Sequence, residues 1–136
     1  MQTSGPGETE ALGARLAADL RSGDVVLVRG ELGSGKTTLV RGAARALGVT
    51  GAVTSPTFSI AHRYRADAAT VTHLDLYRLV DMQGEEPDML GDYLGPGQIA
   101  FVEWPRQDAP ELGAPRMVVT IAHGGGDERR IEVREP

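Results

Sequence analysis

Residues 25–38 read VVLVRGELGSGKTT, and this stretch decides the fold. Its first four residues form an unbroken apolar run, which is typical of a strand buried on both faces of a parallel sheet. Residues 30–37 follow directly and match the pattern Gly-x-x-x-x-Gly-Lys-Thr. The glycines let successive backbone N–H groups turn inward around phosphate oxygens, and a helix that follows adds the partial positive charge of its N-terminus. The stretch therefore predicts a strand, a phosphate-binding loop (P-loop) and a helix.

Each polar residue of the predicted P-loop has a chemical task. Lys36 is the only lysine in a chain with 14 lysine and arginine residues, and its compact ammonium stands where it can neutralise the outer phosphates. Thr37 offers a hydroxyl to Mg²⁺, and Thr38 can bond the inner phosphate. The loop thus predicts binding of a purine nucleoside triphosphate together with magnesium. The remaining residues expected around the phosphates are Gly33, Ser34 and Gly35.

A P-loop enzyme also needs an acid at the end of a neighbouring strand, either to hold the magnesium shell or to align a water molecule. Glu103 follows the apolar run of residues 99–102, and Asp75 follows the half-apolar residues 70–74. Either carboxylate can instead be an ordinary surface group at a strand end. If both lie near one magnesium ion, one of them is left to orient the attacking water. The predicted catalytic residues are Lys36, Asp75 and Glu103, and the pattern does not decide which acid orients the water.

Two further residues are candidates on weaker grounds. Thr57 lies after the predicted P-loop helix, where a switch segment responds to a terminal phosphate, although its Ser-Pro-Thr surroundings are also an ordinary start to a strand. Trp104 follows Glu103 and suits the rim of the sheet, where it can be core, partner contact or base-stacking platform. His73 fits a structural histidine with a satisfied hydrogen bond better than a ligand.

The rest of the pattern predicts a single α/β domain. Residues 1–8 are small and polar, which predicts a frayed start, and Thr9 is suited to cap a first helix that runs to Leu20. A second helix is predicted over residues 36–47, with its apolar residues on one side. We expect a P-loop ATPase domain over residues 9–136, with a mostly parallel central sheet flanked by helices and antiparallel edge strands at the C-terminal end. Strands are expected at residues 25–28, 58–64, 70–76, 99–102, 117–122 and 130–133.

Composition narrows the function further. The 136 residues include 40% apolar side chains, enough for one packed core, and no cysteine that could form a disulfide or a thiolate metal site. No apolar run approaches the length of a membrane span, so we expect a soluble cytoplasmic protein without membrane contact. The formal net charge is −5, whereas a protein that grips nucleic acid by itself usually has a basic face. If RNA or DNA is involved, we expect a partner to hold it.

Four motifs follow one another in the chain: GELGSGKTT at residues 30–38, SPTF at residues 55–58, HLDLYRL at residues 73–79 and VEWP at residues 102–105. In this order they resemble the TsaE family, formerly YjeE, the small ATPases of bacterial tRNA threonylcarbamoyladenosine synthesis. The resemblance covers residues 8–134, and its last three motifs are far more specific than the P-loop alone. The family usually has a more regular acidic helix where residues 83–88 (QGEEPD) stand here.

The resemblance implies ATP hydrolysis that is weak alone and that supports a partner assembly of TsaD and TsaB. That assembly would attach a threonylcarbamoyl group to the adenosine beside the anticodon, so tRNA would be contacted indirectly. Position by position, Thr37, Asp75 and Glu103 resemble the magnesium and water residues of the family. Thr9 resembles its adenine-side contact, and Arg130 on the last strand resembles a further nucleotide contact. Thr57 and Trp104 also fall within family motifs.

Other classes of nucleotide-binding protein fit the residues less well. A GTPase needs an Asn-Lys-x-Asp element, which cannot exist in a chain with no asparagine and one lysine, and no Leu-Ser-Gly-Gly-Gln signature of an ABC ATPase is present. A small-molecule P-loop kinase remains an alternative, although residues 81–97 contain no arginine for a mobile lid. A second alternative is a switch in which ATP occupancy controls docking and turnover is not required.

Overall fold

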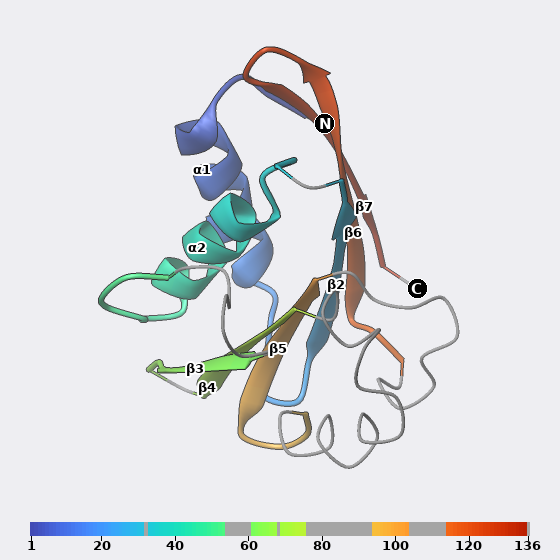
Figure 1. The fold of residues 1–136 in the computed structure, drawn as a ribbon. Helices are drawn as coiled ribbons and strands as arrows, with labels where there is room; N and C mark the ends of the chain where they lie inside the picture. The colour runs from blue at the N-terminus through green and yellow to red at the C-terminus, as the bar shows by residue number, and fades with distance from the viewer. Residues whose placement is uncertain (32, 54–60, 68, 76–93, 104–113, 136) are drawn as a thin grey trace.

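The computed structural model describes residues 1–31, 33–53, 61–67, 69–75, 94–103 and 114–135. These residues build a seven-stranded sheet in the order β1-β7-β6-β2-β5-β4-β3, with two helices on one of its faces (Figure 1). The elements are β1 (Gln2–Thr3), α1 (Pro6–Ala17), β2 (Val25–Gly30), α2 (Lys36–Ala46), β3 (Ala61–Arg65), β4 (Thr70–Asp75), β5 (Gln98–Glu103), β6 (Met117–Gly125) and β7 (Glu128–Arg134).

The centre of the sheet is parallel and its edges are antiparallel. Strand β2 lies between β5 and β6 and runs parallel to both, and β4 runs parallel to β5. Strand β7 pairs antiparallel with β6, as expected for the C-terminal end of the chain, and β3 pairs antiparallel with β4. The fold class expected from the sequence is confirmed. Because parallel strands end at the same edge, the last residues of β2, β4 and β5 meet there.

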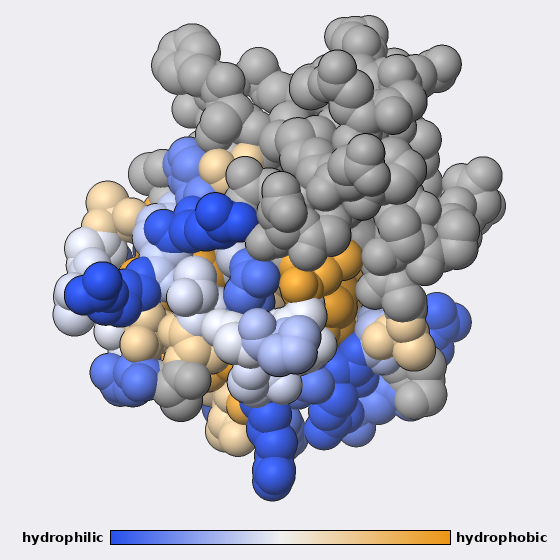
Figure 2. Space-filling model, turned by 90° about the horizontal axis from the view of Figure 1, so that it is seen from below, coloured by the Kyte–Doolittle hydropathy of each residue, from blue (hydrophilic) through white to orange (hydrophobic). Residues whose placement is uncertain are grey.

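Most of the core lies between the sheet and the helices. It includes Val28 of β2, Phe101 of β5 and Leu39 of α2, all of which are buried. A smaller apolar cluster on the opposite face contains Leu27, Leu74 and their neighbours. Seen from the amino-terminal end of the parallel strands, the described surface shows a small apolar area with hydrophilic residues beside it (Figure 2). The sheet is therefore packed on both faces along its centre, as an unbroken apolar strand requires.

The two helices approach each other closely because each carries a glycine at the contact. A Cβ on Gly42 would lie 2.0 Å from the carbonyl oxygen of Glu10, and a Cβ on Gly13 would lie 2.2 Å from that of Leu39. Larger side chains would push the helices apart, since backbone atoms cannot yield as a flexible side chain can. This contact fixes the N-terminal turn of α1 beside the N-terminal turn of α2.

The beginning of the chain differs from the prediction. Residues 1–8 were expected to be frayed, but Gln2 and Thr3 pair with β7, and the Met1 ammonium donates a hydrogen bond of 2.9 Å to the Ile131 carbonyl. Pairing covers the open edge that β7 would otherwise present. Helix α1 begins at Pro6, whose fixed φ suits the first helical position. Thr9 therefore lies inside the helix, and the prediction that it caps the helix was wrong.

In the part of the chain that the structure describes, no helix has both the length and the apolar character that crossing a membrane requires.

Candidate phosphate-binding site

The loop between β2 and α2 has the conformation that its glycines predicted. Gly33 and Gly35 adopt φ values of +76° and +105°, which side chains with a Cβ rarely tolerate. Gly35 is the residue before the first turn of α2, and its carbonyl accepts a hydrogen bond of 3.0 Å from the Leu39 N–H. The first backbone N–H groups of α2 have no partner within the helix. At this edge of the sheet they can donate hydrogen bonds to an anion.

Gly30 and Ser34 close the base of the loop. A Cβ on Gly30 would lie 2.6 Å from both the Ile121 carbonyl oxygen and the Ser34 hydroxyl, so no larger residue fits there. Ser34 is fully buried, and its Oγ has no hydrogen-bond partner among the described residues. Ser34 thus keeps an uncommitted hydroxyl within the loop.

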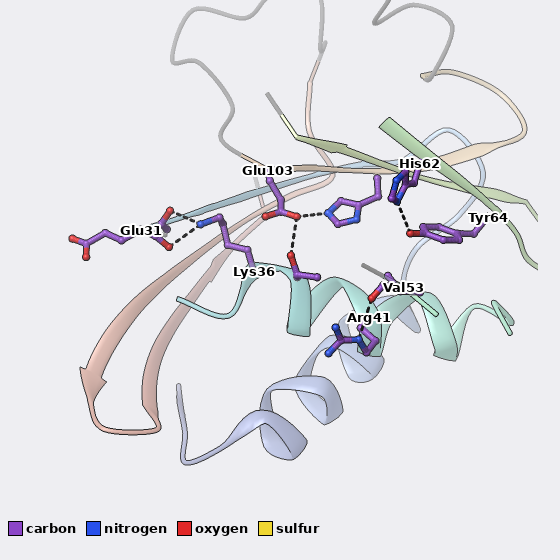
Figure 3. Close-up of polar contacts among 10 residues, drawn as sticks. Glu31, Lys36, Arg41, Val53, His62, Tyr64 and Glu103 are labelled. Carbon is purple, nitrogen blue, oxygen red and sulfur yellow. Dashed lines mark hydrogen bonds and ion pairs between the residues drawn. The ribbon is translucent and has the colours of Figure 1, made fainter. Parts of the chain in front are cut away.

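Lys36 begins α2 and is turned back across the loop. Its Nζ donates hydrogen bonds of 2.7 Å to the Gly30 carbonyl and 2.8 Å to the Glu31 carbonyl (Figure 3). Burial lowers the pKa of Lys36 below its ordinary value, while the negative charges of Glu103 and Asp75 act in the opposite direction. Lys36 is therefore a buried cation held by two backbone oxygens and close enough to both acids to sense their charge.

Asp75 and Glu103 come together at the ends of adjacent parallel strands. They are paired in the register of β4 and β5, and each is almost fully buried. The Thr37 hydroxyl donates a hydrogen bond of 3.4 Å to Glu103 Oε2, and the same oxygen accepts a hydrogen bond from His73 Nε2 (Figure 3). The structure thus brings together the four residues that the sequence analysis proposed for magnesium and catalysis.

These oxygen donors fit a magnesium ion that is also held by phosphate. A hydroxyl from Thr37 and carboxylates from Asp75 and Glu103 are hard ligands, and Mg²⁺ is usually held by one or two carboxylates together with substrate phosphates and water. Among the described residues, no group of three or more His, Asp or Glu side chains forms a metal site by itself. The donor set is the one expected for a metal that arrives with a nucleotide.

A small hollow lies beside the loop, where the N-terminal turns of the two helices face the β6–β7 hairpin. Thr9 and Thr38 line it, together with Gly35 and Arg129. The Thr9 hydroxyl donates to the Gly5 carbonyl at 3.3 Å and lies 2.8 Å from the Thr3 hydroxyl. Thr9 thus lies near the P-loop, although its hydroxyl is already shared with neighbouring groups, and its role as an adenine-side contact stays a prediction.

Arg129 is a residue that the sequence analysis missed. Its Nε donates a hydrogen bond of 2.9 Å to the Ser34 carbonyl, and its Nη1 donates to the carbonyls of Gly126 and Glu128 at 2.9 and 2.8 Å. Arg130, the residue named instead, lines a separate hollow with Met1, Gln2 and other residues of β6 and β7. Neighbouring residues of a strand point to opposite faces, so only one of this pair can reach the loop. The sequence analysis named Arg130, because the register that turns Arg129 toward the loop cannot be read from the sequence.

Two candidate residues, Thr57 and Trp104, lie outside the described residues.

These features define an α/β protein of the P-loop class: a parallel strand, a glycine-rich loop with a buried lysine, and carboxylates at the neighbouring strand ends. The family model described as "Threonylcarbamoyl adenosine biosynthesis protein TsaE" matches residues 3–131. The chain therefore belongs to the TsaE family of threonylcarbamoyl adenosine biosynthesis proteins.

Known proteins agree with this assignment. The protein "tRNA threonylcarbamoyladenosine biosynthesis protein TsaE" of Bacillus subtilis is 37% identical over 131 residues, which cover 96% of this chain and 81% of that protein. The protein of the same name from Streptomyces coelicolor is 45% identical over 118 residues, or 85% of this chain and 80% of that one. The crystal structure of Bacillus subtilis YdiB superposes with a TM-score of 0.75 at 34% identity, covering 96% of this chain and 80% of YdiB.

Proposed function

We propose that this protein is a magnesium-dependent ATPase that supports threonylcarbamoyl transfer to the tRNA adenosine beside the anticodon, acting with TsaD and TsaB. The observation that carries the proposal is the meeting of Lys36 and Thr37 with Asp75 and Glu103 at one edge of the sheet. The Thr37 hydroxyl and Glu103 Oε2 are 3.4 Å apart, although 66 positions separate the two residues in the chain. Membership of the TsaE family supports a role in threonylcarbamoyl adenosine biosynthesis.

The loop and Lys36 would bind the phosphates. Backbone N–H groups at the start of α2 have no partner within the helix and donate readily to phosphate oxygens. The Lys36 ammonium, now bonded to the carbonyls of Gly30 and Glu31, would exchange at least one of them for a phosphate oxygen. Donors held in place before the reaction stabilise charge that develops on the transferred phosphoryl group without reorganising.

Thr37, Asp75 and Glu103 would hold the magnesium ion, which neutralises phosphate charge when bound. One carboxylate can be enough for an ion that also binds phosphate, so either acid could instead accept a hydrogen bond from water and align it with the γ-phosphate. Both are near enough to Lys36 to affect its pKa, and both therefore remain candidates for this task. Glu103 is the better placed for a test because its contact with Thr37 is defined.

The hollow between the helix N-termini and the hairpin would receive the nucleoside. It adjoins the P-loop at Gly35 and Thr38, and the Arg129 guanidinium lies at its rim. Thr9 contributes a small side chain there and would contact the adenine side. The net charge of −5 supports a division of labour in which tRNA is held by partner subunits, since an acidic protein repels the phosphate backbone.

The test is reconstituted tRNA modification with TsaB, TsaD and tRNA, in which ATP hydrolysis and threonylcarbamoylation are measured together. We compare the wild type with Glu103→Ala and, as a matched control, with Glu132→Ala, which removes an exposed carboxylate from β7. We expect slow hydrolysis by the protein alone, faster hydrolysis with partners, and loss of both hydrolysis and repeated modification in Glu103→Ala only.

Two other outcomes would redirect the proposal. Full modification by Glu103→Ala, with hydrolysis abolished, would show that ATP occupancy suffices and that turnover is not required. Transfer of the γ-phosphate to a small acceptor rather than to water would identify a P-loop kinase.

A further inference from the structure

His73 is a buried polar residue to which the proposed function gives no task. It lies in β4, two positions before Asp75, and its side chain is fully buried. Residues two apart in a strand share a face, so His73 and Asp75 both lie on the side of the sheet that β4 presents to the P-loop. The register aligns Asp75 with Glu103 and His73 with Phe101, so His73 lies one residue pair before Glu103 on the same face of the neighbouring strand.

The contact between His73 and Glu103 is specific in its atoms. His73 Nε2 bonds to Glu103 Oε2, the same oxygen that accepts the Thr37 hydroxyl. A carboxylate can only accept, so the proton of this hydrogen bond is carried by Nε2 of the imidazole. His73 Nδ1 is buried and has no hydrogen-bond partner among the described residues, so Glu103 is the polar contact of this ring within them.

The two donors to Oε2, Thr37 and His73, would respond differently to the binding of magnesium and nucleotide. Thr37 is a proposed magnesium ligand, and its hydroxyl oxygen would turn from Glu103 toward the ion. The imidazole of His73 is enclosed between the sheet and the core and stays where it is. After Thr37 turns away, His73 is the remaining donor of the two that hold this carboxylate in one orientation.

We propose that His73 is a positioning residue that fixes the Glu103 carboxylate through Oε2 and so directs Oε1 toward the phosphate loop. The inference rests on the proposed role of Glu103. Groups that orient a ligand or a base by hydrogen bonding typically change affinity or activity by about 10-fold to 100-fold when they are removed. A histidine that only fills the core would affect folding and leave the chemical step unchanged.

Two substitutions separate these roles. His73→Met keeps a buried side chain of similar size and removes the donor, whereas His73→Gln places an amide N–H near the position of Nε2. His62→Met is the matched control, because His62 pairs with His73 across β3 and β4 but bonds to the Tyr64 hydroxyl rather than to an acid.

Steady-state hydrolysis of magnesium ATP measures kcat and KM separately, and thermal unfolding checks that each variant is folded. We expect His73→Met to lower kcat by about 10-fold or more with little change in KM, His73→Gln to recover most of the loss, and His62→Met to match the wild type. Equal kcat in His73→Met and the wild type, while Glu103→Ala is inactive, would overturn the inference and leave the proposed function intact. Absence of hydrolysis in the wild type, alone and with partners, would overturn both.

A second measurement needs no nucleotide and no activity. Nitrogen-15 NMR of the histidine side chains in the nucleotide-free protein distinguishes the two tautomers. We expect His73 to carry a slowly exchanging proton on Nε2, and we expect that signal to shift or disappear in Glu103→Ala. A proton on Nδ1 alone in the wild type would contradict the proposed hydrogen bond even if His73→Met folds poorly.

Discussion

The two ends of the same parallel strands are built from different residues. At their amino-terminal ends β2, β4 and β5 bury Val25, Val71 and Ile99, whereas at the carboxyl ends β4 and β5 bury Asp75 and Glu103. Apolar burial stabilises the fold, but buried charge is costly unless it is paired or bonded. The apolar end of the strands therefore stabilises the fold, and the fold positions the polar residues at the other end for chemistry.

The largest expected effect lies at the apolar end. Ile99→Ala removes buried methyl groups from the core, and we expect it to lower the free energy of unfolding by about 3 kcal/mol. Nucleotide affinity should stay within about twofold of the wild type at temperatures where the variant is folded, because the site itself is unchanged. Denaturant unfolding and equilibrium binding of a fluorescent ATP analogue measure the two quantities. Loss of nucleotide affinity without loss of stability would contradict the separate roles of the two strand ends.

At the polar end we expect Lys36→Ala to lower nucleotide affinity rather than stability. Removing the ammonium should weaken magnesium ATP binding by about 100-fold, since bonds between charged partners are the strongest in the site. Arg45→Ala is the control, because it removes a cation from the same helix that is half exposed and pairs only loosely with Glu10. Equal affinity of Lys36→Ala and Arg45→Ala, measured by the same binding titration, would mean that the loop does not hold the phosphates.

A smaller effect distinguishes the two neighbouring arginines of β7. Arg129→Gln should weaken nucleotide binding by about 10-fold, because its guanidinium holds the Ser34 carbonyl and lies at the rim of the hollow beside the loop. Arg130→Gln should change affinity by less than about twofold, since Arg130 lines a different hollow. Isothermal titration with magnesium ATP compares the pair. The opposite ranking would favour the residue that the sequence analysis named.

Sequence predicted the parts of this molecule that depend on local pattern. The apolar runs of β2 and β5 and the helix after the P-loop are where they were expected, and the strand ends bring Asp75 to Glu103. These features follow from periodicity and from the rule that parallel strands end at one edge.

The missed features depend on register and on contacts between distant segments. Gln2 and Thr3 form a strand only because β7 offers them an edge, and no local pattern marks a two-residue strand. Arg129 rather than Arg130 faces the loop because of the hairpin register, which the three glycines of the turn leave open in the sequence. The sequence analysis rightly expected His73 to have a satisfied hydrogen bond, but that its partner is Glu103 depends on the pairing of β4 with β5.

The smallest effect concerns the pH dependence of stability. Burial lowers the pKa of Lys36 below 10.5, so between its folded-state pKa and 10.5 the unfolded chain binds more protons than the folded protein. The free energy of unfolding of the wild type, taken relative to Lys36→Met, should therefore rise with pH across that window and stay level below it. Denaturant unfolding of both proteins over the alkaline range measures the difference. A relative stability that falls as pH rises would mean that the ammonium is stabilised by its surroundings.

A single-turnover experiment tests directly whether the carboxyl edge of the sheet hydrolyses ATP, as we propose, and whether the reaction requires Glu103. Protein in excess over γ-phosphate-labelled ATP is mixed with magnesium or with a chelator, and inorganic phosphate is followed over time for the wild type and Glu103→Ala. We expect phosphate release that requires magnesium and is lost in Glu103→Ala, although that variant still binds ATP. Release at the same rate from Glu103→Ala, or label that passes to an acceptor other than water, would contradict this proposal.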